Sequence, residues 1–131
     1  MSKSNVDLAR ELTEAWNRSD WESMRTLFWP EAEAIAPRGW PEAEDSRGWE
    51  AVQRTFERLK DSWIDERFEL ESTEAIDEQR VLQHGHWRGA GRESGIPLDL
   101  QVWFISTFRE GRIARVVYYL DRDEAMRDAG R

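Results

Sequence analysis

The stretch LDLQVWFISTFREGRIARVVYYL, residues 98–120, decides the fold class of this chain. Aromatic and β-branched residues dominate two segments, 98–108 and 112–120, and the polar segment 109–112 between them has the composition of a hairpin turn. Apolar residues occupy both sets of alternating positions in each segment. The two segments are therefore predicted to be antiparallel strands.

Further strands are predicted upstream of this hairpin. In residues 67–71 two apolar side chains alternate with charged ones, and residues 81–88 show the same strand-like period. The glycine-rich segment 89–95 follows them as a looser turn. Residues 31–35 alternate weakly and are interpreted as a short edge strand. Consecutive strands joined by such turns pair antiparallel, so the second half of the chain predicts an antiparallel meander.

Helical periodicity precedes the meander. Residues 5–17 predict an amphipathic helix, and a capping pattern that begins at Ser19 predicts a short second helix that Pro30 ends. From 47 to 63, apolar residues recur at alternating intervals of three and four, which predicts the long helix of the protein. Residues 121–130 predict a short closing helix. Helices followed by strands indicate an α+β fold in which the helices cover one face of the sheet.

The composition excludes several classes of function. A chain of 131 residues fits one domain, and eight Trp and five Phe supply a large apolar area. With no Cys there is no disulfide framework or thiolate nucleophile, and a reducing compartment is expected. The net charge of −8 argues against nucleic-acid binding. No apolar run approaches the roughly 18–20 residues that span a bilayer. We therefore expect one cytoplasmic domain, residues 1–131, that binds neither nucleic acid nor membranes.

The charged segments and the strands that are apolar on both faces predict which surfaces meet water and which are covered. The charged residues of 65–80 and 121–131 are interpreted as solvated faces and helix ends. Helices on only one face of the sheet would leave apolar side chains of the last strands in water. We therefore expect a homodimer that forms through the outer face of the sheet.

Five segments, taken together and in this order, carry a resemblance to a known family. They are residues 15–21, 27–31, 37–41, 89–95 and 108–121. On these motifs the chain resembles the SnoaL-like branch of the nuclear transport factor 2-like (NTF2-like) superfamily. The resemblance implies a cone of bent sheet against a long helix, usually in a homodimer, with a pocket inside. It implies no single function, because related members include polyketide cyclases, dehydratases, isomerases, epoxide hydrolases and proteins without known catalysis.

Tyr118 occupies the position at which the resemblance places a catalytic Asp of the hydrolase and cyclase members. By the same offset Val116 replaces a Trp, and Gly85 and Trp87 stand near the positions of the Arg and Asp of the hydrolases' acid–base cluster. These departures remove the acid–base pair of that mechanism. An unperturbed tyrosine has a pKa of about 10, so Tyr118 is expected to donate a hydrogen bond or stabilise an oxyanion instead of acting as a base. The alternative is that Tyr118 only fills the cone.

Strand alternation extends this position into a wall. If Tyr118 faces the pocket and the hairpin closes around residues 110–111, Thr107 and Ala114 face it too, together with larger apolar side chains. The predicted ligand-binding residues are Trp16, Trp87, Trp103, Ile105, Val116 and Tyr118. Such an aromatic and apolar lining suits a flat or greasy ligand oriented by few polar groups. A filled core without ligand is the alternative.

His84 and His86 are the two histidines of the chain, and their spacing puts both on one face of a strand. No third ligand is indicated, so neither a metal nor another cofactor is expected. Alternation sets the histidines opposite Trp87. We expect Trp87 to point inward and the histidines outward, toward the dimer face. With the opposite register, His86 would join Tyr118 as a catalytic residue, since imidazole has the intrinsic pKa of a general base.

Three functions are compatible with these patterns. The first is a small-molecule-binding protein, with the possibility of a cofactor-independent isomerase, cyclase, dehydratase or hydrolase activity on an apolar cyclic compound. The second is a non-catalytic ligand sensor or carrier without an inward carboxylate or imidazole. The third is a dimeric structural module whose cone is filled by its own tryptophans. The sequence leaves the choice and the ligand open.

Overall fold

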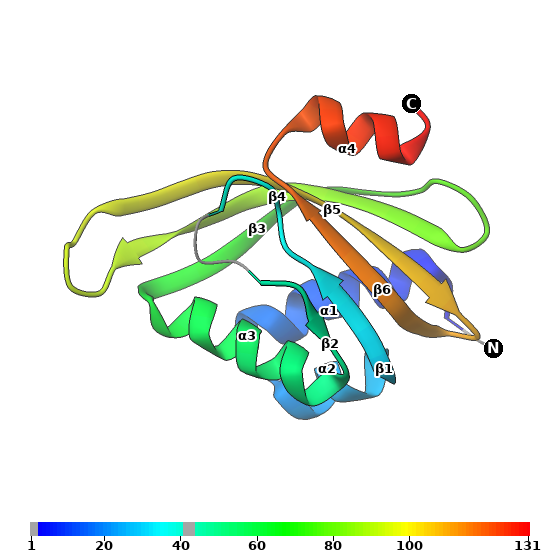
Figure 1. Ribbon diagram of the computed structural model, residues 1–131, viewed down its shortest axis with the longest axis horizontal. Coiled ribbons are helices and arrows are strands. Elements are labelled where there is room, and N and C mark those ends of the chain that lie inside the picture. The colour runs from blue at the N-terminus through cyan, green and yellow to red at the C-terminus, as the bar shows by residue number, and fades with distance from the viewer. Residues whose placement is uncertain (1–2, 41–43) are drawn as a thin grey trace.

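The computed structural model describes residues 3–40 and 44–131. Its elements are α1 (Asn5–Arg18), α2 (Trp21–Leu27), β1 (Phe28–Ile35), β2 (Ser46–Arg47), α3 (Trp49–Asp61), β3 (Trp63–Ala75), β4 (Arg80–Gly91), β5 (Pro97–Arg109), β6 (Arg112–Tyr119) and α4 (Arg122–Ala129). The strands form one sheet in the order β2-β1-β6-β5-β4-β3. Figure 1 shows this sheet curving over α1, α2 and α3, with α4 on the opposite face. The fold is the α+β cone that the sequence predicts.

The two N-terminal helices are set by their caps. The Ser4 hydroxyl accepts a hydrogen bond from the Asp7 N–H and starts α1. Ser19 was expected to cap α2, but it adopts φ of 53° and ends α1 instead, and Asp20 caps α2 by accepting from the Ser23 N–H. Ser and Asp can both cap the N-terminus of a helix, so the sequence alone did not distinguish Ser19 from Asp20. Ser19 is used to end α1 in the left-handed conformation, which leaves Asp20 to cap α2.

The first strand is longer than predicted, and it pairs in an unexpected way. Pro30 does not end α2, since Leu27 is the last helical residue and Pro30 lies inside β1. β1 pairs with β6 in parallel, which makes the sheet mixed, whereas the other neighbouring strands pair antiparallel. The short β2 replaces the expected start of the long helix. The loop predicted at residues 37–41 is described up to Trp40, and Pro41 lies outside the described residues.

The meander has the predicted antiparallel order, but its last hairpin contains a bulge. Phe108 pairs with Ile113, whereas Thr107 pairs with Arg115, so Ala114 is the extra residue. The remaining pairs are displaced by one position, and Tyr118 faces Phe104 instead of Trp103. A shift of one residue exchanges the two faces of a strand. The bulge therefore decides which side chains of β5 look into the cone.

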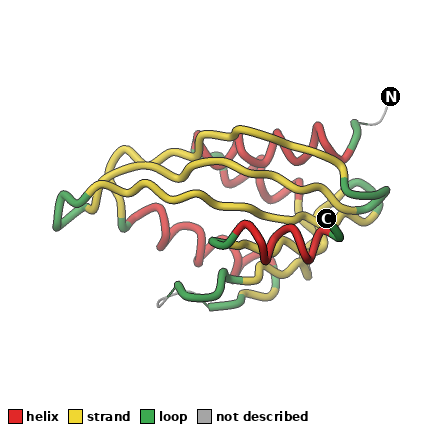
Figure 2. The backbone as a smooth tube through the Cα atoms, turned by 90° about the horizontal axis from the view of Figure 1, so that it is seen from above, coloured by secondary structure: helices red, strands yellow, loops and turns green. Residues whose placement is uncertain are grey.

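The convex face of the sheet carries a second apolar cluster beneath α4. Leu82, Trp103, Ile105 and Tyr119 pack there against Ala125 and Ala129 of the helix. The Tyr119 hydroxyl donates a hydrogen bond of 2.7 Å to the Asp128 carboxylate and fixes α4 in place. The prediction that helices cover only one face is therefore wrong, because α4 buries these outer residues within the chain itself. Figure 2 shows the long strands extending well past α4 on one side.

Candidate functional site

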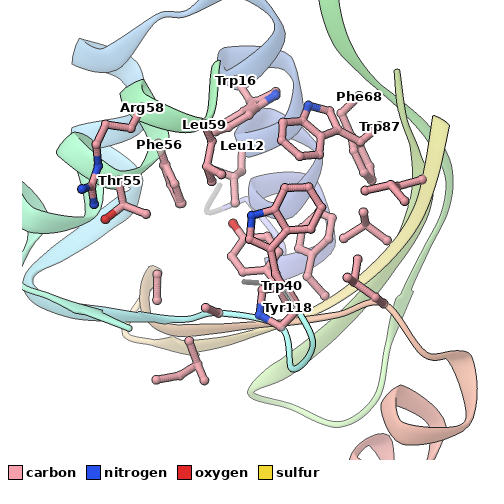
Figure 3. A pocket seen from close by; sticks show the side chains of 18 of the residues that line it. Leu12, Trp16, Trp40, Thr55, Phe56, Arg58, Leu59, Phe68, Trp87 and Tyr118 are labelled. Atoms are coloured by element: carbon pink, nitrogen blue, oxygen red, sulfur yellow. The ribbon is translucent and has the colours of Figure 1, made fainter. Parts of the chain in front are cut away.

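A cavity of about 270 Å³ lies between the concave face of the sheet and helices α1 and α3. Its wall is mainly apolar, and α1, α3, every strand of the meander and the segment after β1 contribute to it. The aromatic members are Trp16, Trp40, Phe56, Phe68, Trp87, Phe104 and Tyr118. The side chains therefore leave a hollow at the centre of the cone instead of filling it (Figure 3).

The aromatic side chains brace one another around this hollow. Phe56 meets Trp16 with ring centroids 5.3 Å apart and Tyr118 at 6.3 Å, both edge to face. On the sheet, Phe104 lies 5.4 Å from Tyr118 and 5.6 Å from Phe68. Such pairs contribute about 0.5–1.5 kcal/mol each beyond the apolar area they bury. The wall is therefore held open by contacts among its own members.

Phe68 owes its place to a glycine on the neighbouring strand. A Cβ atom at Gly85 would lie 2.3 Å from the Glu69 carbonyl oxygen and 2.7 Å from the Phe68 ring. Both distances are shorter than any real contact, so a side chain at position 85 would push Phe68 out of place. Gly85, which replaces a polar residue of the related hydrolases' cluster in the resemblance, here makes room for an aromatic ring.

Tyr118 points from β6 into the cavity (Figure 3). Its hydroxyl has no hydrogen-bond partner among the residues that the structure describes. Burial raises the pKa of this hydroxyl above its usual value of 10.0, because the phenolate would lose its hydration. Tyr118 therefore stays protonated near neutral pH and is available as a hydrogen-bond donor. It cannot act there as a base.

The other polar residues of the described lining are Thr13, Glu44, Thr55, Arg58 and Ser62. The Thr55 hydroxyl is 2.6 Å from the Ser46 hydroxyl, and the Ser62 hydroxyl donates to the Arg58 carbonyl oxygen at 3.0 Å. Within the described part of the lining, the one carboxylate belongs to the exposed Glu44, and there is no imidazole. No acid–base pair converges on a point inside the cone in this part of the chain.

A buried ion pair stands directly behind the tryptophan wall. Glu66 accepts hydrogen bonds at one carboxylate oxygen from the indole N–H groups of Trp16, at 2.6 Å, and Trp87, at 2.8 Å. The Lys60 ammonium donates to the other carboxylate oxygen at 2.5 Å and to the Trp16 carbonyl oxygen at 2.8 Å. The side chains of Lys60 and Glu66 are only 11% and 5% exposed. This network fixes both indole rings, and it shows that the solvated face predicted for residues 65–80 is wrong at Glu66.

The structure places the predicted wall residues in three different environments. Trp16, Trp87 and Tyr118 line the cavity. Trp103 and Ile105 lie on the convex face beneath α4, because the bulge at Ala114 reverses the expected face of β5. Val116 is on the concave side but is fully buried in the core and does not reach the cavity.

The bulge also moves Thr107 and Ala114 out of the predicted wall. Thr107 pairs with Arg115 on the convex face, and Ala114 is the bulged residue itself. The β5 side chains that line the cavity are instead Leu100, Val102 and Phe104, which lie on the face opposite to that of the predicted residues. Sequence reasoning missed Phe104 for this reason, whereas Phe56 was assigned only to a core stripe and Trp40 only to a loop.

His84 and His86 point away from the cavity, as expected for a register that turns Trp87 inward. His86 contacts Glu71 at 2.9 Å and Asp99 at 3.3 Å, while the ring of His84 stacks on Trp103 at 4.6 Å. With the sheet between them and the cavity, these imidazoles cannot reach a molecule inside the cone. His86 therefore has no place in a reaction there.

A bent sheet that closes with helices around a cavity defines the NTF2-like class of fold. The sequence profile of the family described as SnoaL-like domain matches residues 9–116, and the chain belongs to this family. No curated protein sequence matches the chain significantly. Family membership confirms the resemblance drawn from the sequence motifs.

Solved structures with low sequence identity share the fold. An NTF2-like protein from Burkholderia thailandensis E264 has a TM-score of 0.82 at 22% identity, covering 95% of this chain and 98% of that one. Bal32a, from a soil-derived mobile gene cassette, has a TM-score of 0.80 at 22% identity, with coverage of 97% and 96%. A candidate SnoaL-like polyketide cyclase from Jannaschia sp. CCS1 has a TM-score of 0.77 at 14% identity, with coverage of 96% and 94%.

Residues 3–40 and 44–131 contain no group of three or more His, Asp or Glu side chains placed to hold a metal ion. None of their helices combines the length and the apolar character needed to cross a bilayer.

Proposed function

We propose that the cone binds one small, mainly apolar molecule with a hydrogen-bond acceptor, and that the Tyr118 hydroxyl orients it. The observation that carries this proposal is a hollow, aromatic-walled cavity into which one unpartnered hydroxyl points from the sheet. Its volume, about 270 Å³, is near the lower end of the roughly 300–1,000 Å³ typical of small-molecule sites. The ligand is accordingly a compound of one or two rings.

The lining favours binding over acid–base catalysis. General acid–base chemistry needs a group whose pKa lies near the working pH and which reaches the reacting atom. Among the described lining residues, Tyr118 is held protonated by burial, and the carboxylate of Glu44 sits exposed at the margin. A carrier or sensor of a small apolar compound is therefore the function best supported.

A second candidate function is catalysis by hydrogen bonding alone. A protonated tyrosine in a dry cavity can stabilise a developing oxyanion on a bound carbonyl compound, as an enolisation or cyclisation would require. The structural similarity to proteins described as candidate polyketide cyclases supports this alternative. In that case Tyr118 would be the catalytic residue by hydrogen bonding, and the proton lost from carbon would pass to water, because no described lining residue is placed to act as its base.

The proposal is tested by two probes that differ in one acceptor. 2-Acetylnaphthalene presents a carbonyl oxygen to Tyr118, whereas 2-ethylnaphthalene has nearly the same shape and no acceptor. Quenching of tryptophan fluorescence measures the Kd of each. In the wild type, 2-acetylnaphthalene should bind about tenfold more tightly, and Tyr118→Phe should remove this difference.

Two results would contradict the proposal. One is that neither probe binds, which would favour a structural module. The other is that Tyr118→Phe leaves the preference for the ketone unchanged, which would place the acceptor elsewhere. Exchange of the methyl hydrogens of 2-acetylnaphthalene for deuterium in D₂O, faster with the wild type than with Tyr118→Phe, would support the catalytic candidate.

Assembly and location are proposed separately from the ligand. We propose a cytoplasmic homodimer in which the part of the convex face that α4 leaves uncovered meets its equivalent in a second chain. The support is the extension of the strands past α4 and the lack of Cys in the sequence. Light scattering that gives the 15.5 kDa of one chain, instead of twice that mass, would reject the dimer.

A further inference from the structure

A second hollow, separate from the cone, lies at the start of α3. It has a volume of about 500 Å³ and is bordered by α2, β1, β2, the first turns of α3 and the start of β6. None of its lining residues also lines the cone cavity. Arg25, Arg47, Arg54 and Arg112 all border this hollow, which is named the arginine cleft below.

The charge of the arginine cleft runs against that of the whole chain. The net charge of the protein is −8, yet the cleft brings four guanidinium groups together with a single carboxylate, that of Glu50. Arg25 is paired with Glu22. Among the described residues, Arg47, Arg54 and Arg112 have no carboxylate within ion-pair distance. The cleft therefore keeps a net positive charge.

The backbone adds donors to the same place. α3 begins after Gly48, which has no side chain to cap the helix, so the N–H groups of the first turn keep no side-chain acceptor. The nearby Ser46 cannot cap it, since its hydroxyl is bonded to Thr55. The N-terminal end of a helix carries a partial positive charge and open N–H groups, and both attract anions.

A buried side chain beside this cleft lacks a hydrogen-bond acceptor as well. Trp49, the first residue of α3, lines the cleft and is only 7% exposed. Its indole N–H is buried and has no hydrogen-bond partner among the described residues. A buried donor without an acceptor is destabilising, and so such groups are usually satisfied by a ligand, an ion or water.

We propose that the arginine cleft is a second binding site, for an oxyanion of the phosphate type, either free or as a monoester. Planar guanidinium groups match the oxygens of a phosphate with paired hydrogen bonds, and the open turn of α3 supplies further donors. This site goes beyond the function proposed for the cone and does not depend on it.

The test is a thermal-shift titration with potassium phosphate against potassium chloride at matched ionic strength. The Tm of the wild type should rise with phosphate and not with chloride, since a ligand that binds the folded state stabilises it. Arg47→Gln combined with Arg54→Gln should weaken phosphate binding by about a hundredfold, about tenfold for each guanidinium lost. The matched control is Arg10→Gln with Arg127→Gln, which removes the same charge from two exposed helical sites and should keep the shift.

One single variant sharpens the site. Glu50→Gln removes the one opposing carboxylate and should strengthen phosphate binding. A parallel titration with phenyl phosphate distinguishes free phosphate from a phosphate monoester as the ligand. Tighter binding of phenyl phosphate than of inorganic phosphate would indicate a monoester. Absence of any shift beyond chloride in the wild type would overturn the proposal, as would a full shift in the Arg47→Gln/Arg54→Gln variant.

Discussion

Tyr118 and Tyr119 are adjacent in the chain and meet opposite faces of the same sheet. Burial raises the pKa of both hydroxyls. Tyr119 points to the convex face, where its hydroxyl donates to Asp128 and holds α4. Tyr118 points into the cone, where its hydroxyl has no partner among the described residues. Two neighbouring tyrosines therefore differ in whether the chain itself supplies a hydrogen-bond partner for the hydroxyl.

The difference separates a polar group that is satisfied within the chain from one that has no partner among the described residues. On the convex face, α4 fills the surface and satisfies the polar group it buries. On the concave face, the indole N–H groups of Trp16 and Trp87 are satisfied by Glu66 behind the wall, and the hydroxyl at the front is left open. A polar group that faces a cavity and has no partner within the described chain is a candidate for contact with a ligand.

The largest effect is expected at Glu66, which supports the concave face from behind. Glu66→Ala should lower the free energy of unfolding by about 3–5 kcal/mol, because Lys60 stays buried without its carboxylate. Urea denaturation measures this loss. The double variant Lys60→Met/Glu66→Leu should recover much of the stability but not the orientation of the indoles, so its affinity for 2-acetylnaphthalene should stay low. A Glu66→Ala protein as stable as the wild type would contradict the buried pair.

Trp103 tests whether the two faces are independent. Trp103→Ala should also cost about 3–5 kcal/mol, since it empties the cluster beneath α4, yet it should leave the Kd for 2-acetylnaphthalene unchanged. Trp40→Ala is the matched change on the cavity side. It should weaken binding of 2-acetylnaphthalene and lower the free energy of unfolding by less than Trp103→Ala does. Equal effects of both variants on the probe would mean that the sheet does not isolate its two faces.

The two tyrosines give a smaller, directly paired comparison. Tyr119→Phe should lower the free energy of unfolding by about 1 kcal/mol, because Asp128 loses its hydrogen bond. Tyr118→Phe should change it by less than about 0.5 kcal/mol, because no bond within the described chain is lost. Urea denaturation of both variants measures the pair. The reverse order would show that Tyr118 has a structural partner.

The smallest effect is expected at high pH. Both tyrosines have pKa values raised above 10.0 in the folded state, so the unfolded chain releases their protons first as pH rises. Their contribution to stability is therefore complete below pH 10 and declines above it. The free energy of unfolding should fall more steeply there in the wild type than in Tyr118→Phe. Since the chain has only two Tyr, tyrosinate absorbance follows both directly.

Much of the fold could be predicted because its signals are local. The apolar period of α3, the cap at Ser4 and the composition of the last hairpin each depend on a few neighbouring residues. The parallel pairing of β1 with β6 could not be predicted in this way, since it joins distant segments. α4 was predicted as a helix, but its docking depends on a surface formed by β4, β5 and β6 together.

The cavity wall was only partly predictable, and the errors have one main source. Trp87 and Tyr118 could be placed by combining strand alternation with the offset that the family resemblance supplies. Trp103 and Ile105 were assigned to the wrong face because the bulge at Ala114 has no glycine or other marker in the sequence. Glu66 was missed because its partners come from α1, α3 and β4, and a carboxylate in a charged segment gives no sign of such contacts.

The parallel pairing of β1 with β6 has a consequence for the order of folding. β1 leaves the ribosome about 80 residues before the strand it pairs with, so it must wait for almost the whole chain to be made. The hairpins from β3 to β5 can form earlier, since they join neighbouring segments. The cavity needs both ends of the chain, because the segment after β1 and Tyr118 of β6 both line it. A nascent or C-terminally truncated chain would therefore hold helices and a partial meander, and closure of the cone would be among the last steps of its synthesis.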